Sequence, residues 1–279
     1  MPSLTVDGAA VAYSDTGTPE GSGPDAPAVV FGHGLLFSGW MFAAQIEALR
    51  ADYRCVTIDW RGQGDSPPAR SGYDMDTLYA DAVQLIEQVV GAPVHYVGLS
   101  MGGFVGQRIA ARRPELVRSL TLLSTSAEPE SLRGRVEYPV LAFVYHLVGP
   151  NAVRSLVEKV MLGPSFRADP RSKPIVDEWM QKLATCDRAA IRRAVLGVAN
   201  RAGVTAEIGA IKAPTRVIVG EHDAATPPKR ARRIAELIPG AGLETVPNCG
   251  HSSTIEQPEA VTALLQAFLA EVDANPSAE

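Results

Sequence analysis

A serine in a glycine-rich pentapeptide is the residue best suited to covalent chemistry. Ser100 stands in the sequence GLSMG at residues 98–102. An apolar run over 94–99 leads into it, and a helical pattern over 102–113 follows it. A G-x-S-x-G sequence between a strand and a helix is typical of a nucleophile elbow, whose tight turn lifts the serine oxygen to the edge of a sheet. The pattern therefore predicts Ser100 as a catalytic nucleophile.

A serine hydroxyl is a poor nucleophile at neutral pH, so it needs a base within hydrogen-bond reach and a third group that orients the base. The base is predicted to be His251, in the loop between the last strand and the last helix. The acid should follow the strand that ends at Val219, where residues 220–223 read GEHD. Asp223 is our choice there. Its neighbour Glu221, and Glu128 after an earlier strand, are the alternatives.

Acyl transfer also needs donors aimed at the developing oxyanion. The backbone N–H of Met101, the residue after the nucleophile at a helix N-terminus, is one expected donor. The other should come from the loop after the strand at 28–31, which reads HGLL over 33–36. There the N–H of Leu35 is best placed, and His33 is expected to brace the loop and to be one of the substrate-pocket residues.

Alternating strands and helices must hold these residues. An antiparallel hairpin is expected over 4–13, and Pro258 opens the first turn of a helix that runs to residue 272. Short apolar runs predict further strands at 28–31, 54–58, 94–99, 118–123, 215–219 and 243–246. Helices are expected between them at 41–49, 77–90, 102–113 and 228–238. This alternation predicts an α/β fold: a mostly parallel eight-stranded sheet with helices on both faces.

The alternation stops between residues 128 and 212, where helical patches occur without a convincing strand. We therefore predict a core domain from 1–127 and 213–279, and a helical cap inserted at 128–212. Aromatic side chains in the cap and after the donor loop could line an acyl or alcohol pocket. The candidates are Phe37, Trp40, Tyr138, Phe143 and Trp179.

With these motifs in this order, the chain resembles the α/β-hydrolase family over about residues 4 to 272. The resemblance rests on GHG at 32–34, DWRGQGDS at 59–66, the serine pentapeptide, GEHD at 220–223 and GH at 250–251. It implies the α/β-hydrolase fold with a helical cap, a Ser100-Asp223-His251 triad and an oxyanion hole from Leu35 and Met101. Within the family the chain is similar to cofactor-free esterases, lactonases and haloperoxidase-like perhydrolases. The family's dehalogenases and epoxide hydrolases use an aspartate where this chain has Ser100.

Composition and missing motifs narrow the partners. A net charge of −5 and the lack of a basic stripe argue against nucleic acid or an anionic membrane as a partner. No apolar run is long enough to span a bilayer, no secretion signal is visible, and three scattered cysteines favour a reducing compartment, so we expect a cytoplasmic protein. Without a dinucleotide fingerprint, a Walker loop or a metal motif, no cofactor and no metal are expected. The oligomeric state is left open.

The expected activity is hydrolysis of small to medium carboxylic esters or lactones through an acyl-enzyme on Ser100. Two alternatives keep the same triad, namely hydrolysis of a carbon–carbon bond and perhydrolysis of the haloperoxidase kind. A third, more remote alternative is a ligand-binding protein on this fold that has no catalytic activity.

Overall fold

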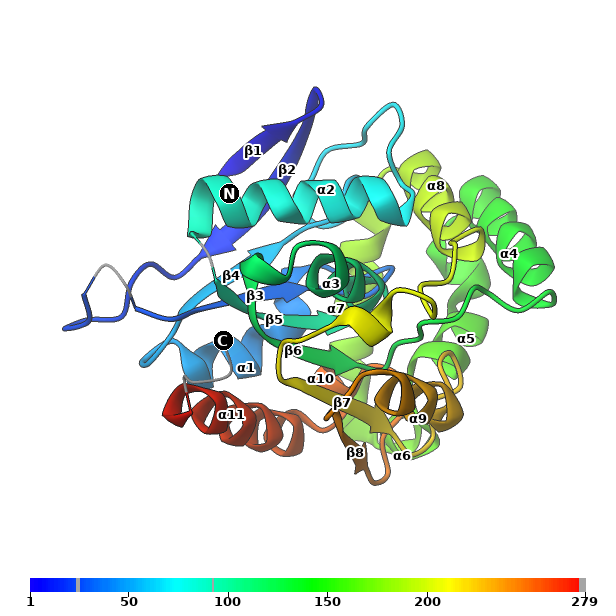
Figure 1. Ribbon diagram of the computed structural model, residues 1–279. Coiled ribbons are helices and arrows are strands. Elements are labelled where there is room, and N and C mark those ends of the chain that lie inside the picture. The colour runs from blue at the N-terminus through cyan, green and yellow to red at the C-terminus, as the bar shows by residue number, and fades with distance from the viewer. Residues whose placement is uncertain (24–25, 92, 276–279) are drawn as a thin grey trace.

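Eight strands form one sheet, as the sequence predicts (Figure 1). The computed structural model describes residues 1–23, 26–91 and 93–275. In the order β1-β2-β4-β3-β5-β6-β7-β8, the first two pairings are antiparallel and all the others are parallel. The strands are β1 (Ser3–Val6), β2 (Ala9–Asp15), β3 (Ala28–Gly32), β4 (Arg54–Ile58), β5 (Val94–Leu99), β6 (Val117–Leu123), β7 (Thr215–Gly220) and β8 (Gly242–Val246).

Helices cover both faces of this sheet, which leaves its carboxyl edge to carry the loops. One face packs against α2 (Met75–Leu85), α3 (Met101–Arg112) and α9 (Pro228–Leu237). The other packs against α1 (Ala43–Leu49) and α11 (Pro258–Ala274), which contact each other. A short helical turn at Gly39–Phe42 precedes α1, and another at Ile86–Val90 follows α2. The short helix α10 (Ser253–Glu256) precedes α11.

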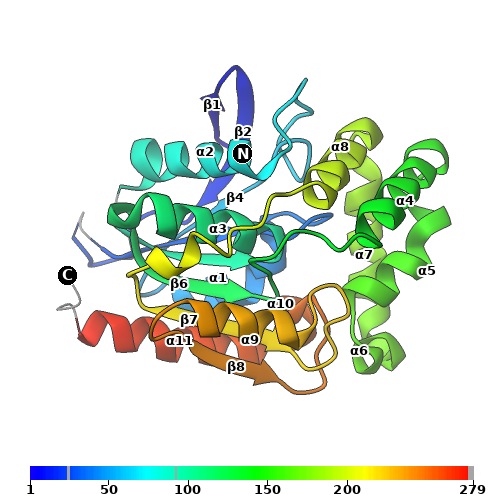
Figure 2. The same ribbon diagram turned by 45° about the vertical axis from the view of Figure 1, so that its right-hand side comes forward.

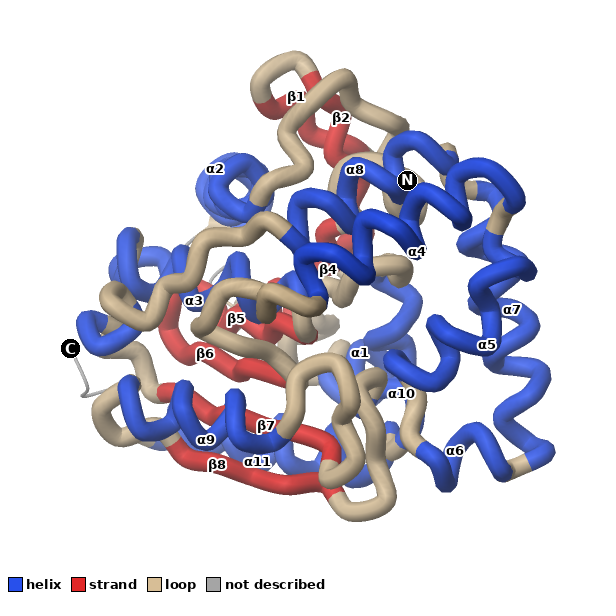
Figure 3. The backbone as a smooth tube through the Cα atoms, turned by 90° about the vertical axis from the view of Figure 1, so that its right-hand side faces the viewer, coloured by secondary structure: helices blue, strands red, loops and turns tan. Residues whose placement is uncertain are grey.

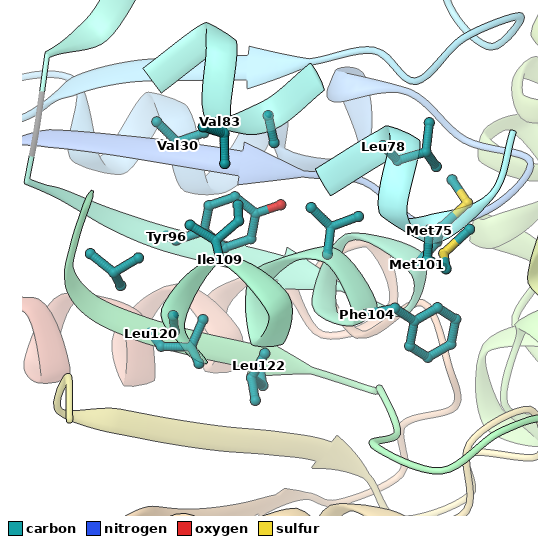
Figure 4. Packing of buried hydrophobic residues seen from close by; sticks show 14 of the residues in the cluster. Val30, Met75, Leu78, Val83, Tyr96, Met101, Phe104, Ile109, Leu120 and Leu122 are labelled. Atoms are coloured by element: carbon teal, nitrogen blue, oxygen red, sulfur yellow. The ribbon is translucent and has the colours of Figure 1, made fainter. Parts of the chain in front are cut away.

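The central strands read as continuous apolar runs because both of their faces are buried. In β3, Val29, Val30 and Phe31 have no exposed surface. Their side chains alternate between the two cores, so Val30 joins one and Val29 and Phe31 the other. Figure 4 shows Val30 and Tyr96 from the sheet packed against side chains of α2 and α3. This packing therefore fixes the position, relative to the sheet, of the turn before α3 that contains Ser100.

Residues 128–212, which we call the cap segment, contain only helices. They are α4 (Gly134–Val148), α5 (Pro150–Met161), α6 (Pro164–Ala168), α7 (Lys173–Thr185) and α8 (Arg188–Ala199), with short turns at Pro170–Ser172 and Ile208–Ala210. Figure 2 shows these helices gathered on one side of the molecule, and Figure 3 shows α4 and α8 packed side by side. No helix in the described ranges is both long and apolar enough to span a bilayer.

Helix α4 is apolar on both faces. On its inner face Ala142 and Tyr145 are buried. On its outer face Val136, Phe143 and Leu147 are 50 to 66% exposed. The sequence alone does not distinguish the two faces of such a helix, because periodicity identifies a core face by its polar opposite.

A buried histidine in β5 makes the stability of the fold sensitive to acid. His95 contacts Ser119 and Asp273, and burial lowers its pKa to about 4. Its pKa in the unfolded chain is near 6.5, so its contribution is present above that pH and is lost as the pH falls towards 4. We expect this residue to lower the free energy of unfolding by about 3 kcal/mol over that range. Urea unfolding from pH 7 to 4.5 should show a shallower decline for His95→Gln, and an unchanged one for the exposed control His222→Gln.

Candidate active site

The turn that carries Ser100 is strained, as a nucleophile elbow requires. Ser100 has φ 51° and ψ −108°, a backbone conformation that residues other than glycine rarely adopt. Its N–H donates to the Leu123 carbonyl (2.9 Å), and its own carbonyl accepts the Thr125 hydroxyl (2.8 Å). A Cβ atom at Gly102 would collide with the carbonyl of Gly32 on the neighbouring strand. The glycine therefore lets α3 start in contact with β3, which holds the turn closed.

His251 and Asp223 form a buried hydrogen-bonded pair. The Nδ1 atom of His251 lies 2.9 Å from Asp223 Oδ1 and 3.0 Å from Oδ2. Thr226 supports the carboxylate, donating its backbone N–H to Oδ1 (2.8 Å) and its hydroxyl to Oδ2 (2.9 Å). Burial opposes ionisation of Asp223, but the charge and hydrogen bond of His251, together with the Thr226 donors, hold its pKa below the ordinary value. The carboxylate is thus ready to orient the ring and to stabilise an imidazolium.

The two alternative acids lie elsewhere. Glu221 is half-exposed and accepts the backbone N–H of Asn248 (3.0 Å). Glu128 is also partly exposed and pairs with Arg230 (2.9 Å). Among these carboxylates, Asp223 is the one in hydrogen-bond contact with His251.

Ser100 and His251 meet at one cavity of about 120 Å³, which Thr226 also lines. Within the described residues no hydrogen bond joins Ser100 to His251, and such bonds are often long before substrate binds. Most of the wall is apolar and comes from the cap segment, including Leu141, Val157 and Ile191. The lining of this cavity therefore suits an uncharged organic molecule beside the serine.

The predicted donor loop also reaches this cavity, since Leu35 lines it. Within the described part of the chain, the backbone N–H groups of Leu35 and Met101 make no hydrogen bond, whereas that of Leu36 donates to Gln63 Oε1 (2.8 Å). An N–H that is held in place without an acceptor can serve an oxyanion.

His33 supports this loop and lies outside the cavity, which corrects its placement in the substrate pocket. It is fully buried, accepts the backbone N–H of Trp60 at Nε2 (3.0 Å) and contacts the Gly34 carbonyl through Nδ1 (2.7 Å). Burial holds the pKa of His33 below its ordinary value. With both ring nitrogens engaged, this histidine is unsuited to proton transfer.

Of the other aromatic pocket candidates, the structure places only Tyr138 on the wall of this cavity. Phe37 and Trp40 line a separate cavity, and Phe143 points outward and is half-exposed. Trp179 is buried and stacks on Phe37 with ring centroids 4.5 Å apart. None of these four side chains lines the Ser100 cavity, because sequence proximity to the donor loop or cap does not specify which way a side chain points.

Trp179 has a different role, because it joins the cap to the donor loop. Its indole N–H donates to the carbonyl of Leu36 (2.8 Å), one residue after Leu35. Leu36 has a positive φ of 69°. Gln63 therefore accepts the N–H of this strained residue, and Trp179 donates to its carbonyl, so both of its backbone polar groups are held.

Sequence reasoning missed Glu256, a buried carboxylate that organises the His251 loop. It accepts backbone N–H groups from Gly250 (2.9 Å), Ser252 (3.0 Å) and Gly163 of the cap (2.8 Å). Burial raises its pKa. An acidic residue shortly after the histidine was the available signal, but it reads equally well as an exposed helix residue. Within the described residues, His, Cys, Asp and Glu side chains form no cluster of three that could hold a metal ion.

Comparison with known proteins gives consistent results. A family model described as the alpha/beta hydrolase fold matches residues 27–258. The enol-lactonase from Burkholderia xenovorans LB400 is 27% identical with a TM-score of 0.87, over 96% of this chain and 100% of the other. A thermophilic esterase from Thermogutta terrifontis is 28% identical with a TM-score of 0.85, over 97% of both chains. A Variovorax paradoxus protein assigned as the carbamate hydrolase RutD is 30% identical over 252 residues, which are 90% of this chain and 94% of that protein.

Proposed function

Because this chain belongs to the α/β-hydrolase family, we propose that it is a serine hydrolase of small carboxylic esters or lactones. The observation that carries the proposal is the pairing of Asp223 with His251 at the cavity that Ser100 also lines. A serine in a strained turn, a histidine at the same cavity and a buried carboxylate are the three parts that nucleophilic acyl transfer requires.

In the proposed mechanism, the Ser100 oxygen attacks the substrate carbonyl while His251 Nε2 takes its proton. Asp223 holds the ring with its proton on Nδ1, which leaves Nε2 free to act as the base. The negative charge that develops on the carbonyl oxygen is stabilised by the N–H groups of Leu35 and Met101.

His251 then gives its proton to the leaving alkoxide, and the carbon–oxygen bond breaks. The acyl group stays on Ser100 until a water molecule, deprotonated by His251, attacks it and releases the acid. In a lactone the same bond breaks, and the alcohol remains attached to the acid.

We assign residues 1–127 and 213–279 to the catalytic core and 128–212 to a lid over it. The cavity beneath this lid is about 120 Å³, similar to cavities that hold a benzene-sized molecule. A substrate with a short acyl or alcohol part fits this space with the lid as it stands. A longer chain requires the cap to move.

The experiment is a substrate panel combined with labelling of the serine. We expect ethyl esters of short acids, and γ- or δ-lactones, to be hydrolysed with saturable kinetics. A fluorophosphonate probe should label the wild-type protein at Ser100. Faster turnover of carbamates or 1,3-diketones, or faster peroxide-dependent bromination, would show that this reaction, and not ester hydrolysis, is the activity of the site. Absence of both turnover and labelling would favour a binding protein without catalytic activity.

A further inference from the structure

A buried ion pair lies on the wall of this mostly apolar cavity. Arg201 and Glu130 both line the cavity of Ser100. Arg201 Nη1 lies 2.8 Å from Glu130 Oε2, and the two side chains are 3% and 10% exposed. Moving two charges out of water costs about as much as their attraction returns, so such a pair is weak evidence for stability. In a ligand cavity, a few convergent polar groups usually fix the orientation of the ligand.

One edge of the Arg201 guanidinium is left without an acceptor. Within the described part of the chain, both of its hydrogen bonds use Nη1, one to Glu130 and one to the Val198 carbonyl (3.0 Å). Its Nε is buried and has no partner among the described residues. A buried donor without an acceptor is unfavourable, so the guanidinium keeps hydrogen-bonding capacity that the described residues do not use.

This guanidinium lies close to the nucleophile. Its central carbon is 4.2 Å from the ring centroid of Phe104, whose backbone N–H donates to the carbonyl of Ser100 (3.0 Å). Phe104 lies one helical turn after Ser100, and Ser100, Phe104 and Arg201 all line the same cavity.

Tyr138 adds a second polar group to the same wall. Tyr138, Glu130 and Arg201 line one cavity, where burial and then the charge of Glu130 raise the pKa of the Tyr138 hydroxyl. It makes no hydrogen bond to the described residues, so it also has a proton to donate.

We propose that Arg201 and Tyr138 form a subsite that binds an uncharged acceptor oxygen of the substrate, away from the carbonyl that Ser100 attacks. This deepens the proposed function by naming the substrate class, an ester or lactone that carries a second carbonyl such as a ketone. The oxygen is uncharged because Glu130 already neutralises Arg201, and a carboxylate would add a second negative charge beside Glu130.

A purely structural role for the pair makes a different prediction. Glu130 and Arg201 stand near the two ends of the cap segment, so their contact also ties those ends together. Arg230 and Glu128 make a similar ion pair (2.9 Å) in the same region without lining the cavity. Arg230→Met is therefore the matched control, because it removes a guanidinium from the cap junction and leaves the subsite intact.

The test compares ethyl 4-oxopentanoate with ethyl pentanoate, and 4-oxopentyl acetate with pentyl acetate, by pH-stat. Each pair differs by one ketone, in the acyl part or in the alcohol part. We expect kcat/KM of the wild-type protein to favour the ketone about 10- to 100-fold in one of the two pairs. Arg201→Met should abolish this preference, Arg201→Lys should restore part of it, and Arg230→Met should retain it.

Two further measurements keep the test decisive. The double variant Glu130→Gln/Arg201→Met removes both charges, so a folding defect from an unpaired carboxylate cannot imitate the result. Calorimetric binding of the ketone esters to Ser100→Ala, with and without Arg201→Met, tests the subsite even if no ester is hydrolysed. The subsite is wrong if neither turnover nor binding favours the ketone, or if the preference persists without Arg201. Binding of the ketone without hydrolysis by the wild-type protein would contradict only the proposed function.

Discussion

Replacing Ser100 by alanine should lower kcat for short-chain ethyl esters by about 10⁴- to 10⁶-fold. The substitution removes the atom that forms the acyl-enzyme, and neither His251 nor the donor loop can replace it. Any remaining hydrolysis would come from water attacking a substrate held at the Leu35 and Met101 N–H groups. Steady-state kinetics by pH-stat, together with loss of fluorophosphonate labelling, measure the effect.

The fold should survive this change. Ser100 donates its backbone N–H to Leu123 and accepts the Thr125 hydroxyl at its carbonyl, and alanine keeps both groups. The Ser100→Gly variant should be equally inactive but about 1 kcal/mol more stable than Ser100→Ala, because glycine adopts a φ of 51° without strain. Urea unfolding of the two variants checks this difference. Ester turnover by Ser100→Ala within tenfold of wild type would contradict the assignment of the nucleophile.

The order of elements could be predicted because the relevant signals are local. Buried parallel strands appear in the sequence as continuous apolar runs, so the six strands β3 to β8 were located within one residue of their observed bounds, and the hairpin expected over 4–13 is present as β1 and β2. The fold inferred from them is confirmed by the sheet and by the match of residues 27–258 to the family model. Ser100 and His251 could be placed at one sheet edge for the same reason, since each follows a strand directly or by a short loop.

The structure, and not the sequence, supplies the physical reason for choosing between the neighbouring carboxylates. Glu221 and Asp223 are two residues apart in one loop and carry the same charge. What separates them is that Asp223 is buried under Thr226 and against His251, whereas Glu221 turns to the loop surface. One sequence offers no signal for which way each side chain turns.

The walls of the pocket were the least predictable part. Phe37 and Trp179 were reasonable pocket candidates by residue type, yet they stack on each other and support the donor loop. Arg201 and Glu130 were not candidates at all, because a charge in a helical insertion usually faces solvent. The packing of α4 and α8 over the cavity brings them inside, and that packing depends on contacts far apart in the sequence.

Asp223→Asn should lower kcat by about 10⁴-fold while leaving the fold intact. Asparagine has the shape of aspartate but presents one oxygen and one NH₂ group. The backbone N–H of Thr226 requires an acceptor at the position of Oδ1, which directs the amide oxygen there. The NH₂ group then takes the position of Oδ2, 3.0 Å from His251 Nδ1, with the Thr226 hydroxyl free to accept its second proton.

This orientation reverses the roles along the Asp223–His251 contact. A proton on Nδ1 would face the asparagine NH₂ group at 3.0 Å, which disfavours that tautomer although the amide oxygen lies 2.9 Å away. Donation from the NH₂ group to Nδ1 then puts the ring proton on Nε2, the nitrogen that must accept the proton of Ser100. His251 can then no longer act as a base, although every heavy atom stays in place. Glu221→Gln is the matched control, because it neutralises a carboxylate in the same loop that does not contact His251, and its kcat should stay within about twofold of wild type. A large loss in Glu221→Gln with little in Asp223→Asn would transfer the role of acid to Glu221. The predicted contrast isolates the tautomer of His251, since the two variants change the net charge of the loop equally.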